Sequence, residues 1–151
     1  MELRPATNRD SGAIRELVFS VLAEYGLVPD PENTDRDLED VETFYFSNGG
    51  YFGVVELGGR LSATVGIARV DNQSCELRKM YTLPEVRGRG LGKELLKKAI
   101  EIAKDLGYQR MVLETASPLK EAIGLYTSHG FKPYYPSHLS DRCDQAFELN
   151  L

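Results

Sequence analysis

The sequence predicts one α/β domain of the α+β kind over residues 1–151, with a mixed, mostly antiparallel sheet of about seven strands and about four helices on both of its faces. Three observations predict this class. The length suits one domain with a sizeable core. Apolar residues recur at helical spacing in several segments, and short runs rich in Val, Ile, Phe and Tyr lie between them.

The first fifty residues predict a strand and two helices. Residues 2–6 favour a short strand, and Thr7 with Asp10 resembles a capping box. A first helix follows, ended by residues 26–31, and its buried stripe is Ile14, Leu17, Val18, Val21, Leu22 and Tyr25. A second cap at Thr34 and Asp37 begins a second helix, which buries Leu38, Val41 and Tyr45 and ends at residues 48–50.

The remaining segments predict a hairpin, two more helices and further strands. Strands over 51–57 and 61–70 flank Gly58-Gly59, which suits a tight turn with positive φ at both central positions. Residues 75–82 predict the next strand, and 111–113 a short buried one. A third helix carries Leu91, Leu95, Ala99, Ile102 and Leu106 and ends at Gly107. A fourth helix begins at Ser117-Pro118 and ends at Gly130. Strands at 131–135 and 145–151 complete the order β-α-α-β-β-β-α-β-α-β-β.

Composition excludes several functional classes. The chain is 42% hydrophobic and 27% charged, as is usual for soluble globular proteins, and no apolar run approaches the roughly 18 residues of a membrane span. A net charge of −5 argues against a general nucleic-acid surface. We expect a cytoplasmic protein with no membrane partner, free thiols at Cys75 and Cys143, and no metal site.

Charge is unevenly distributed along the chain. Residues 78–98 carry seven basic and two acidic residues, a pattern that fits either a solvated helix face or a polyanionic ligand. Residues 24–42 carry eight acidic residues against Arg36 alone. That acidic stretch could attract a cationic substrate, although an exposed helix surface explains it more simply.

The segment Arg87-Gly88-Arg89-Gly90-Leu91-Gly92 is the strongest indication of function. It connects a predicted strand to an amphipathic helix, so glycines leave backbone N–H groups uncovered where the first helical turn has unpaired donors. A pyrophosphate fits there. The segment lacks the spacing of a Walker A loop and the third glycine of a dinucleotide fingerprint, and it is too isolated for an RNA-binding RGG tract.

This loop resembles motif A of the GNAT N-acetyltransferase superfamily, [Q/R]-x-x-G-x-[G/A], with Arg87, Gly90 and Gly92 at the fixed positions. Residues 76–84 resemble the family's fourth strand and the turn after it. Residues 122–131, A-I-G-L-Y-T-S-H-G-F, resemble its second hallmark, A-x-x-L-Y-x-x-x-G-F. Many members have Asn three residues before that alanine as a cofactor contact, whereas Leu119 stands here, so a pantetheine contact there is left open.

The resemblance implies a GNAT-like fold and an enzyme that uses acetyl-CoA as the acetyl donor. It implies that the glycine loop holds the pyrophosphate and that the preceding strand presents backbone groups to the pantetheine arm, one of them polarising the thioester carbonyl. The expected cofactor-binding residues are Met80, Tyr81, Thr82, Arg87, Gly88, Arg89, Gly90, Leu91, Gly92 and Lys93.

Two residues are candidates for proton transfer. Tyr126 shares an inward helical stripe with Leu119, Ala122 and Ile123, and a phenol protonated at neutral pH can donate to the departing thiolate. Without the motif, an ordinary core tyrosine would be the simpler reading. Glu76, on the strand that leads into the loop, is the candidate general base, and the alternative is a glutamate paired with an arginine.

The acceptor is less defined. Glu24, Tyr25, Asp30, Phe44 and Tyr45, in the first two helices, offer acids and aromatic rings that suit an amine. The leading hypothesis is direct transfer to a primary amine of a small molecule or amino acid in a ternary complex. The alternatives are a protein or peptide acceptor, or a non-catalytic acetyl-CoA sensor. Members of the family often pair, so the resemblance leaves both a monomer and a homodimer open.

Overall fold

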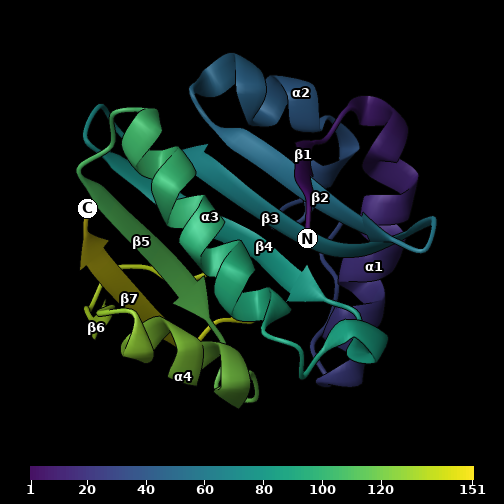
Figure 1. Cartoon of the computed structure of the whole chain (residues 1–151). Coiled ribbons are helices and arrows are strands. Elements are labelled where there is room, and N and C mark those ends of the chain that lie inside the picture. The colour runs from purple at the N-terminus through teal and green to yellow at the C-terminus, as the bar shows by residue number, and fades with distance from the viewer.

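The computed structural model describes all of residues 1–151, and its elements follow the predicted order (Figure 1). The strands are β1 Leu3–Pro5, β2 Tyr51–Leu57, β3 Arg60–Arg69, β4 Ser74–Thr82, β5 Arg110–Thr115, β6 Lys132–Pro133 and β7 Gln145–Asn150. The helices are α1 Ser11–Glu24, α2 Val41–Phe44, α3 Leu91–Asp105 and α4 Lys120–Ser128. None of them combines the length and apolar character needed to cross a bilayer.

The seven strands form one mixed sheet in the order β1-β2-β3-β4-β5-β7-β6, mostly antiparallel as predicted. The parallel pair is β4 with β5, and it extends only from Ser74–Glu76 to the facing residues Arg110–Val112. Beyond Glu76 the two strands part, as their diverging arrows show in Figure 1. This separation opens the interior of the sheet at the end of β4 that leads into the glycine loop.

Helices cover both faces of the sheet. In Figure 1, α3 and α4 lie on the near face, and α1 lies behind β3. Both α1 and α3 contact β3 and β4, so these two strands are the centre of the core. Five residues of the stripe predicted for α1 are buried as expected: Ile14, Leu17, Val18, Val21 and Leu22. The sixth, Tyr25, follows the end of the helix and is half-buried.

The second helix was predicted as one continuous element, which is wrong. The structure has a 3₁₀ turn, Arg36–Glu39, and then the four-residue α2. Asp40 separates them with an extended φ of −147°, and its carboxylate accepts a hydrogen bond from Thr43 N–H at 3.0 Å, so Asp40 caps α2. The predicted core residues Leu38, Val41 and Tyr45 are nevertheless fully buried.

β4 contains a bulge at Lys79. Its pairing with β3 steps from Thr64–Tyr81 to Gly66–Arg78, so β4 has one more residue than β3 across this interval. Lys79 is the only non-glycine residue with positive φ, at 53°. Its carbonyl accepts a hydrogen bond from the buried Thr64 hydroxyl at 2.7 Å, which holds the bulge in place.

Two boundaries in the C-terminal half were also predicted wrongly. α4 begins at Lys120 rather than at Ser117, because the Ser117 hydroxyl donates to Asp144 at 2.6 Å instead of capping a helix. β6 has two residues instead of the predicted five, in a segment where Pro133 and Pro136 have no N–H to donate. In α3, Ile102 is only half-buried and Leu106 is exposed, and Leu96 and Ala103 complete the buried face instead.

Candidate active site

Two cavities lie side by side where β4 and β5 part. We name the one beside the glycine loop the loop cavity, with a volume of about 160 Å³. The splay cavity, about 310 Å³, lies between the diverging strands, α4 and the β6–β7 loop. The two share four wall residues, Met80, Tyr81, Leu119 and Ala122. A molecule in one cavity therefore lies next to a molecule in the other.

The glycine loop has the geometry of an anion cradle. Gly88 and Gly90 have φ of 81° and 79°, and a Cβ added at either would meet nothing within 4 Å. The first helical hydrogen bond of α3 runs from Glu94 N–H to Gly90 O, which leaves the N–H groups of the first three residues of the helix without a partner in the chain. These donors and the helix dipole suit the pyrophosphate of a nucleotide cofactor.

Most of the predicted cofactor-binding residues line the loop cavity. They are Met80, Tyr81, Thr82, Arg87, Gly88, Gly90, Leu91 and Gly92. The side chains of Arg89 and Lys93 are exposed and lie outside its wall. Sequence reasoning missed the share of α1 in this cavity, to which Val21 and Tyr25 contribute, although their helical stripe already faced inward.

Arg87 is engaged within the protein. Its guanidinium donates to Glu24 at the end of α1 and to Thr82 O at 2.7 Å, and it stacks over the Tyr25 ring, 5.6 Å from the centroid. The predicted phosphate-loop arginine therefore ties α1 to the loop. These N–H groups are occupied by Glu24 and Thr82 and stabilise the cavity wall instead of pointing into the cavity.

The edge of β4 that faces β5 is open next to both cavities. Only the first three residues of β4 pair with β5, so from Leu77 onward no strand accompanies that edge. Met80, Tyr81 and Thr82 lie in this unpaired part and line the loop cavity. Their backbone groups on that edge can bind an extended ligand as a neighbouring strand would.

Tyr126 lies in the wall of the splay cavity, with 6% of its surface exposed and its ring 5.7 Å from that of Phe131. Its hydroxyl has no hydrogen-bond partner in the chain. It is also not fully enclosed, because Ser11 Oγ is the only fully enclosed side-chain polar atom that lacks a partner. The Tyr126 hydroxyl therefore reaches the space of the cavity. Burial raises the pKa of Tyr126, with smaller contributions from Tyr81 and Cys143. The phenol is therefore protonated at neutral pH.

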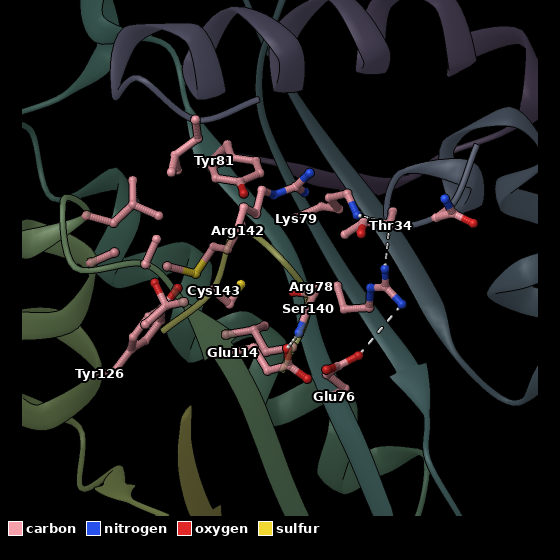
Figure 2. Close-up of a pocket in the computed structure, with 18 residues that line it drawn as sticks. Thr34, Glu76, Arg78, Lys79, Tyr81, Glu114, Tyr126, Ser140, Arg142 and Cys143 are labelled. Carbon is pink, nitrogen blue, oxygen red and sulfur yellow. Dashed lines mark hydrogen bonds and ion pairs between the residues drawn. The ribbon is translucent and has the colours of Figure 1, made fainter. Parts of the chain in front are cut away.

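Glu76 lies on β4 in the wall of the same cavity, 22% exposed (Figure 2). Burial raises the pKa of its carboxyl; Arg78 opposes the rise, and the neighbouring Glu114 adds to it. The sequence left open that Glu76 pairs with an arginine, and Arg78 is that partner. The distance from Arg78 Nη1 to Glu76 Oε1 is 3.7 Å, which is too long for a hydrogen bond. Glu76 therefore contributes a partly exposed carboxyl with a raised pKa to the wall of the splay cavity.

A cluster of buried ion pairs forms another side of this cavity. Asp35 is fully buried and accepts two hydrogen bonds from Arg142, at 2.7 and 2.6 Å. Lys79 Nζ lies 3.2 Å from both Asp35 and Asp37. Asp37 also accepts a hydrogen bond from the buried Tyr45 hydroxyl. Two aspartates therefore neutralise one lysine and one arginine.

This cluster joins three distant segments. It connects the α1–α2 segment, through Asp35, to the β4 bulge at Lys79 and to the β6–β7 loop at Arg142. Burial alone would raise the pKa of Asp35, but Arg142, an N–H donor at Asp30 and Lys79 outweigh burial and lower it to about 2. The acidic stretch read as an exposed helix surface thus contributes carboxylates to the interior.

The acceptor residues expected from the sequence do not line the splay cavity. Glu24, Tyr25, Asp30, Phe44 and Tyr45 all lie outside the wall of the splay cavity. The polar residues that do line it beside Glu76 and Tyr126 include Arg78, Lys79, Glu114, Ser140, Arg142 and Cys143. Arg78 and Lys79 lie in the strand segment 76–84 that resembles the family, whereas no local motif marks the other four, which come from two further segments.

Comparisons with known proteins agree with this geometry. The model of the acetyltransferase (GNAT) family matches residues 16–131. The uncharacterized N-acetyltransferase YjgM of Escherichia coli K12 is 41% identical over 135 residues, which cover 86% of this chain and 81% of that protein. A GNAT-family acetyltransferase from Staphylococcus aureus has the same fold, with a TM-score of 0.91 at 24% identity over 99% of this chain and 98% of the other.

A phosphinothricin acetyltransferase from Sinorhizobium meliloti, solved in complex with acetyl-CoA, has a TM-score of 0.76 at 20% identity, over 99% of this chain and 88% of the other. The family match covers most of the chain, including the glycine loop and the Tyr126 motif. The chain belongs to the GNAT family of acetyl-CoA-dependent N-acetyltransferases.

Proposed function

We propose that this enzyme transfers the acetyl group of acetyl-CoA to a primary amine of a small molecule or amino acid, with both substrates bound at once. The observation that carries the proposal is the shared wall of the two cavities, in which Met80 and Tyr81 face both. The cofactor binds in the loop cavity and the amine in the splay cavity. Their reacting ends then meet at the unpaired edge of β4.

The cofactor assignment is supported by the unpaired N–H groups of the glycine loop and by the acetyl-CoA complex of the S. meliloti relative. Acetyl-CoA supplies an activated acetyl thioester. Backbone N–H groups of residues 88–93 hold its pyrophosphate, and the backbone groups of the Met80, Tyr81 and Thr82 segment that point away from β3 bind its arm. A fixed N–H donor at the thioester oxygen stabilises the charge that develops there, by about 3 kcal/mol in comparable sites.

Two side chains move protons in this scheme. An amine with a pKa near 10 is protonated at neutral pH, and Glu76 accepts that proton, directly or through water, before attack. Tyr126 donates a proton to the departing sulfur, and the second proton that the nitrogen loses as the amide forms restores the phenol, directly or through water. Because its pKa is raised, it is a weak acid, and its contribution is a hydrogen bond that transfers its proton as negative charge grows on the sulfur.

Direct transfer is favoured over an acetylated enzyme. Cys143 is the nucleophilic thiol in the splay cavity. Burial raises its pKa, so the thiol is protonated at neutral pH and is a poor nucleophile. The geometry offers no other activated nucleophile between the two cavities.

A protein or peptide acceptor is the alternative. The splay cavity of about 310 Å³ is at the small end of ligand sites, which favours a small amine.

The experiment is a screen of amines, amino acids and peptides with acetyl-CoA, read by thiol release and by mass spectrometry of the products. We expect acetylation of a small primary amine. Acetylation of peptides alone would favour the alternative. Tight acetyl-CoA binding without any product would contradict the proposed transfer.

A further inference from the structure

Arg78 differs from the other two cations in the wall of the splay cavity. Lys79 lies 3.2 Å from two aspartates, and Arg142 forms a two-pronged pair with Asp35. Arg78 has no carboxylate at hydrogen-bond distance. Its nearest are Glu76 at 3.7 Å and Asp37 at 4.0 Å.

The Arg78 guanidinium is held in place but not saturated. It donates one hydrogen bond to the neutral Thr34 carbonyl at 2.9 Å, and it lies over the Phe44 ring, 5.4 Å from the centroid. A guanidinium has five N–H donors, so several remain available. The side chain is 23% exposed and lines the splay cavity, and Figure 2 shows it beside Glu76, on the side of the cavity away from Tyr126.

Arg78 and Glu76 are two residues apart on β4, and both line the cavity. Their closest charged atoms are 3.7 Å apart, close enough for one small molecule to contact both. An α-amino acid carries its ammonium and carboxylate groups on a single carbon. It therefore matches a carboxylate and a guanidinium at this separation.

We propose that Arg78 is the specificity-determining residue of the acceptor site and binds the α-carboxylate of an amino-acid acceptor while Glu76 faces its amino group. This inference rests on the proposed function and narrows its acceptor to amines with an adjacent carboxylate. Peptide N-termini and simple alkyl amines lack that group. They leave the free donors of Arg78 without a carboxylate at hydrogen-bond distance, which disfavours them as acceptors.

The test compares amino acids with the amines formed by removing their carboxyl group, such as L-phenylalanine with phenethylamine and L-lysine with cadaverine. For the wild type we expect kcat/KM to favour the accepted amino acid over its matched amine by at least about tenfold. In Arg78→Gln we expect this ratio of kcat/KM values to fall by at least about tenfold. Arg78→Lys keeps the positive charge but loses the planar pair of guanidinium donors, and it should give an intermediate ratio.

Arg69→Gln is the matched control, since it removes one positive charge from an exposed arginine outside both cavities and should leave the ratio unchanged. An Arg78 variant that binds acetyl-CoA with the wild-type affinity, as measured by calorimetry, is folded. A wild type that prefers the carboxylate-free amines, or an Arg78→Gln variant that lowers both activities equally, would overturn the inference.

A binding measurement separates this inference from the proposed function. In the presence of free coenzyme A, N-acetyl-L-phenylalanine and the other N-acetylated amino acids of the panel are titrated into wild type and Arg78→Gln. Arg78-dependent binding without turnover supports the carboxylate site and contradicts the transfer reaction. Turnover that does not depend on Arg78 supports the transfer reaction and contradicts the carboxylate site. If there is neither turnover nor Arg78-dependent binding, both hypotheses are overturned.

Discussion

The loop cavity and the splay cavity lie against each other but are built differently. Backbone forms the loop cavity, where glycines at positive φ and the unpaired N–H groups of α3 make the surface. Side chains form the splay cavity, where carboxylates and cations from β4, β5 and two loops meet. Backbone recognition depends on a few glycines in one segment, whereas side-chain recognition depends on groups far apart in the sequence.

Under the proposed function, the loop cavity sets the affinity for acetyl-CoA and the splay cavity sets the choice of acceptor. The cradle can persist while the splay cavity changes, because few residues serve both. We therefore expect substitutions in the loop cavity to change acetyl-CoA binding, and substitutions in the splay cavity to change stability or turnover.

Removing Asp35 should have the largest effect and should fall on stability. Asp35→Ala leaves the half-buried Arg142 without its carboxylate partner and the buried Lys79 with Asp37 alone, and breaking a buried pair in this way costs about 3–5 kcal/mol of unfolding free energy. Denaturant unfolding at neutral pH measures this loss. Asp141→Ala, an exposed aspartate beside Arg142, is the control and should change stability little.

The same variant has a pH signature. The pKa of Asp35 is lowered from 3.8 to about 2, so its stabilisation is complete above pH 4 and disappears as the pH falls toward 2. The difference in stability between wild type and Asp35→Ala should therefore shrink across that window. An equal difference at pH 2 and pH 7 would argue against the ion cluster.

Gly90→Glu should instead act on binding. A side chain at φ of 79° is strained, and its carboxylate would face the pyrophosphate, so acetyl-CoA binding should weaken by about 2–3 kcal/mol in calorimetry. Gly58→Glu places the same residue at a similar φ of 61° in the β2–β3 hairpin, also in open space. If the two variants bind acetyl-CoA equally well, the glycine loop is not the cofactor cradle.

Tyr126→Phe should act on turnover. We expect kcat to fall about 10- to 100-fold, because the sulfur loses its donor, while acetyl-CoA affinity and stability change little since the hydroxyl has no partner in the chain. Tyr108→Phe gives the opposite pattern. It removes a 2.7 Å hydrogen bond to Gly49 O and should cost about 1 kcal/mol of stability with little change in kcat. Unchanged kcat in Tyr126→Phe would exclude Tyr126 from the chemistry.

Glu76→Gln should have the smallest effect, and one that depends on pH. Because burial raises its pKa, Glu76 becomes a base only as the pH rises through that value, so wild-type kcat should increase there. The variant should lose this limb, with a deficit of about tenfold near neutrality that fades as the amine approaches its own pKa of about 10. The exposed Glu85→Gln is the control. Superimposable profiles for wild type and Glu76→Gln would remove Glu76 from the mechanism.

The sequence predicted the fold and the loop cavity well because both depend on local patterns. Helical spacing located α1 and α3, and paired glycines located the β2–β3 turn, where both φ values are positive. The glycine loop was recognisable for the same reason, since Gly88 and Gly90 adopt conformations that other residues rarely reach. Errors arose where a side chain had a tertiary partner, as Ser117 has in Asp144.

The splay cavity was largely beyond prediction from sequence. Asp35 and Arg142 are 107 residues apart, and nothing in either neighbourhood indicates that they pair. The bulge that places Lys79 between two aspartates follows from the register of β3 and β4 rather than from a residue preference. Composition could show that residues 24–42 are acidic, but not which of the acids are buried.

The central claim is that both cavities are filled at once, with transfer across their shared wall. Initial rates measured while acetyl-CoA and the accepted amine are varied together test it most directly. The account predicts intersecting double-reciprocal lines and no acetylated enzyme. Parallel lines, with an acetyl group found on Cys143 by mass spectrometry, would contradict it.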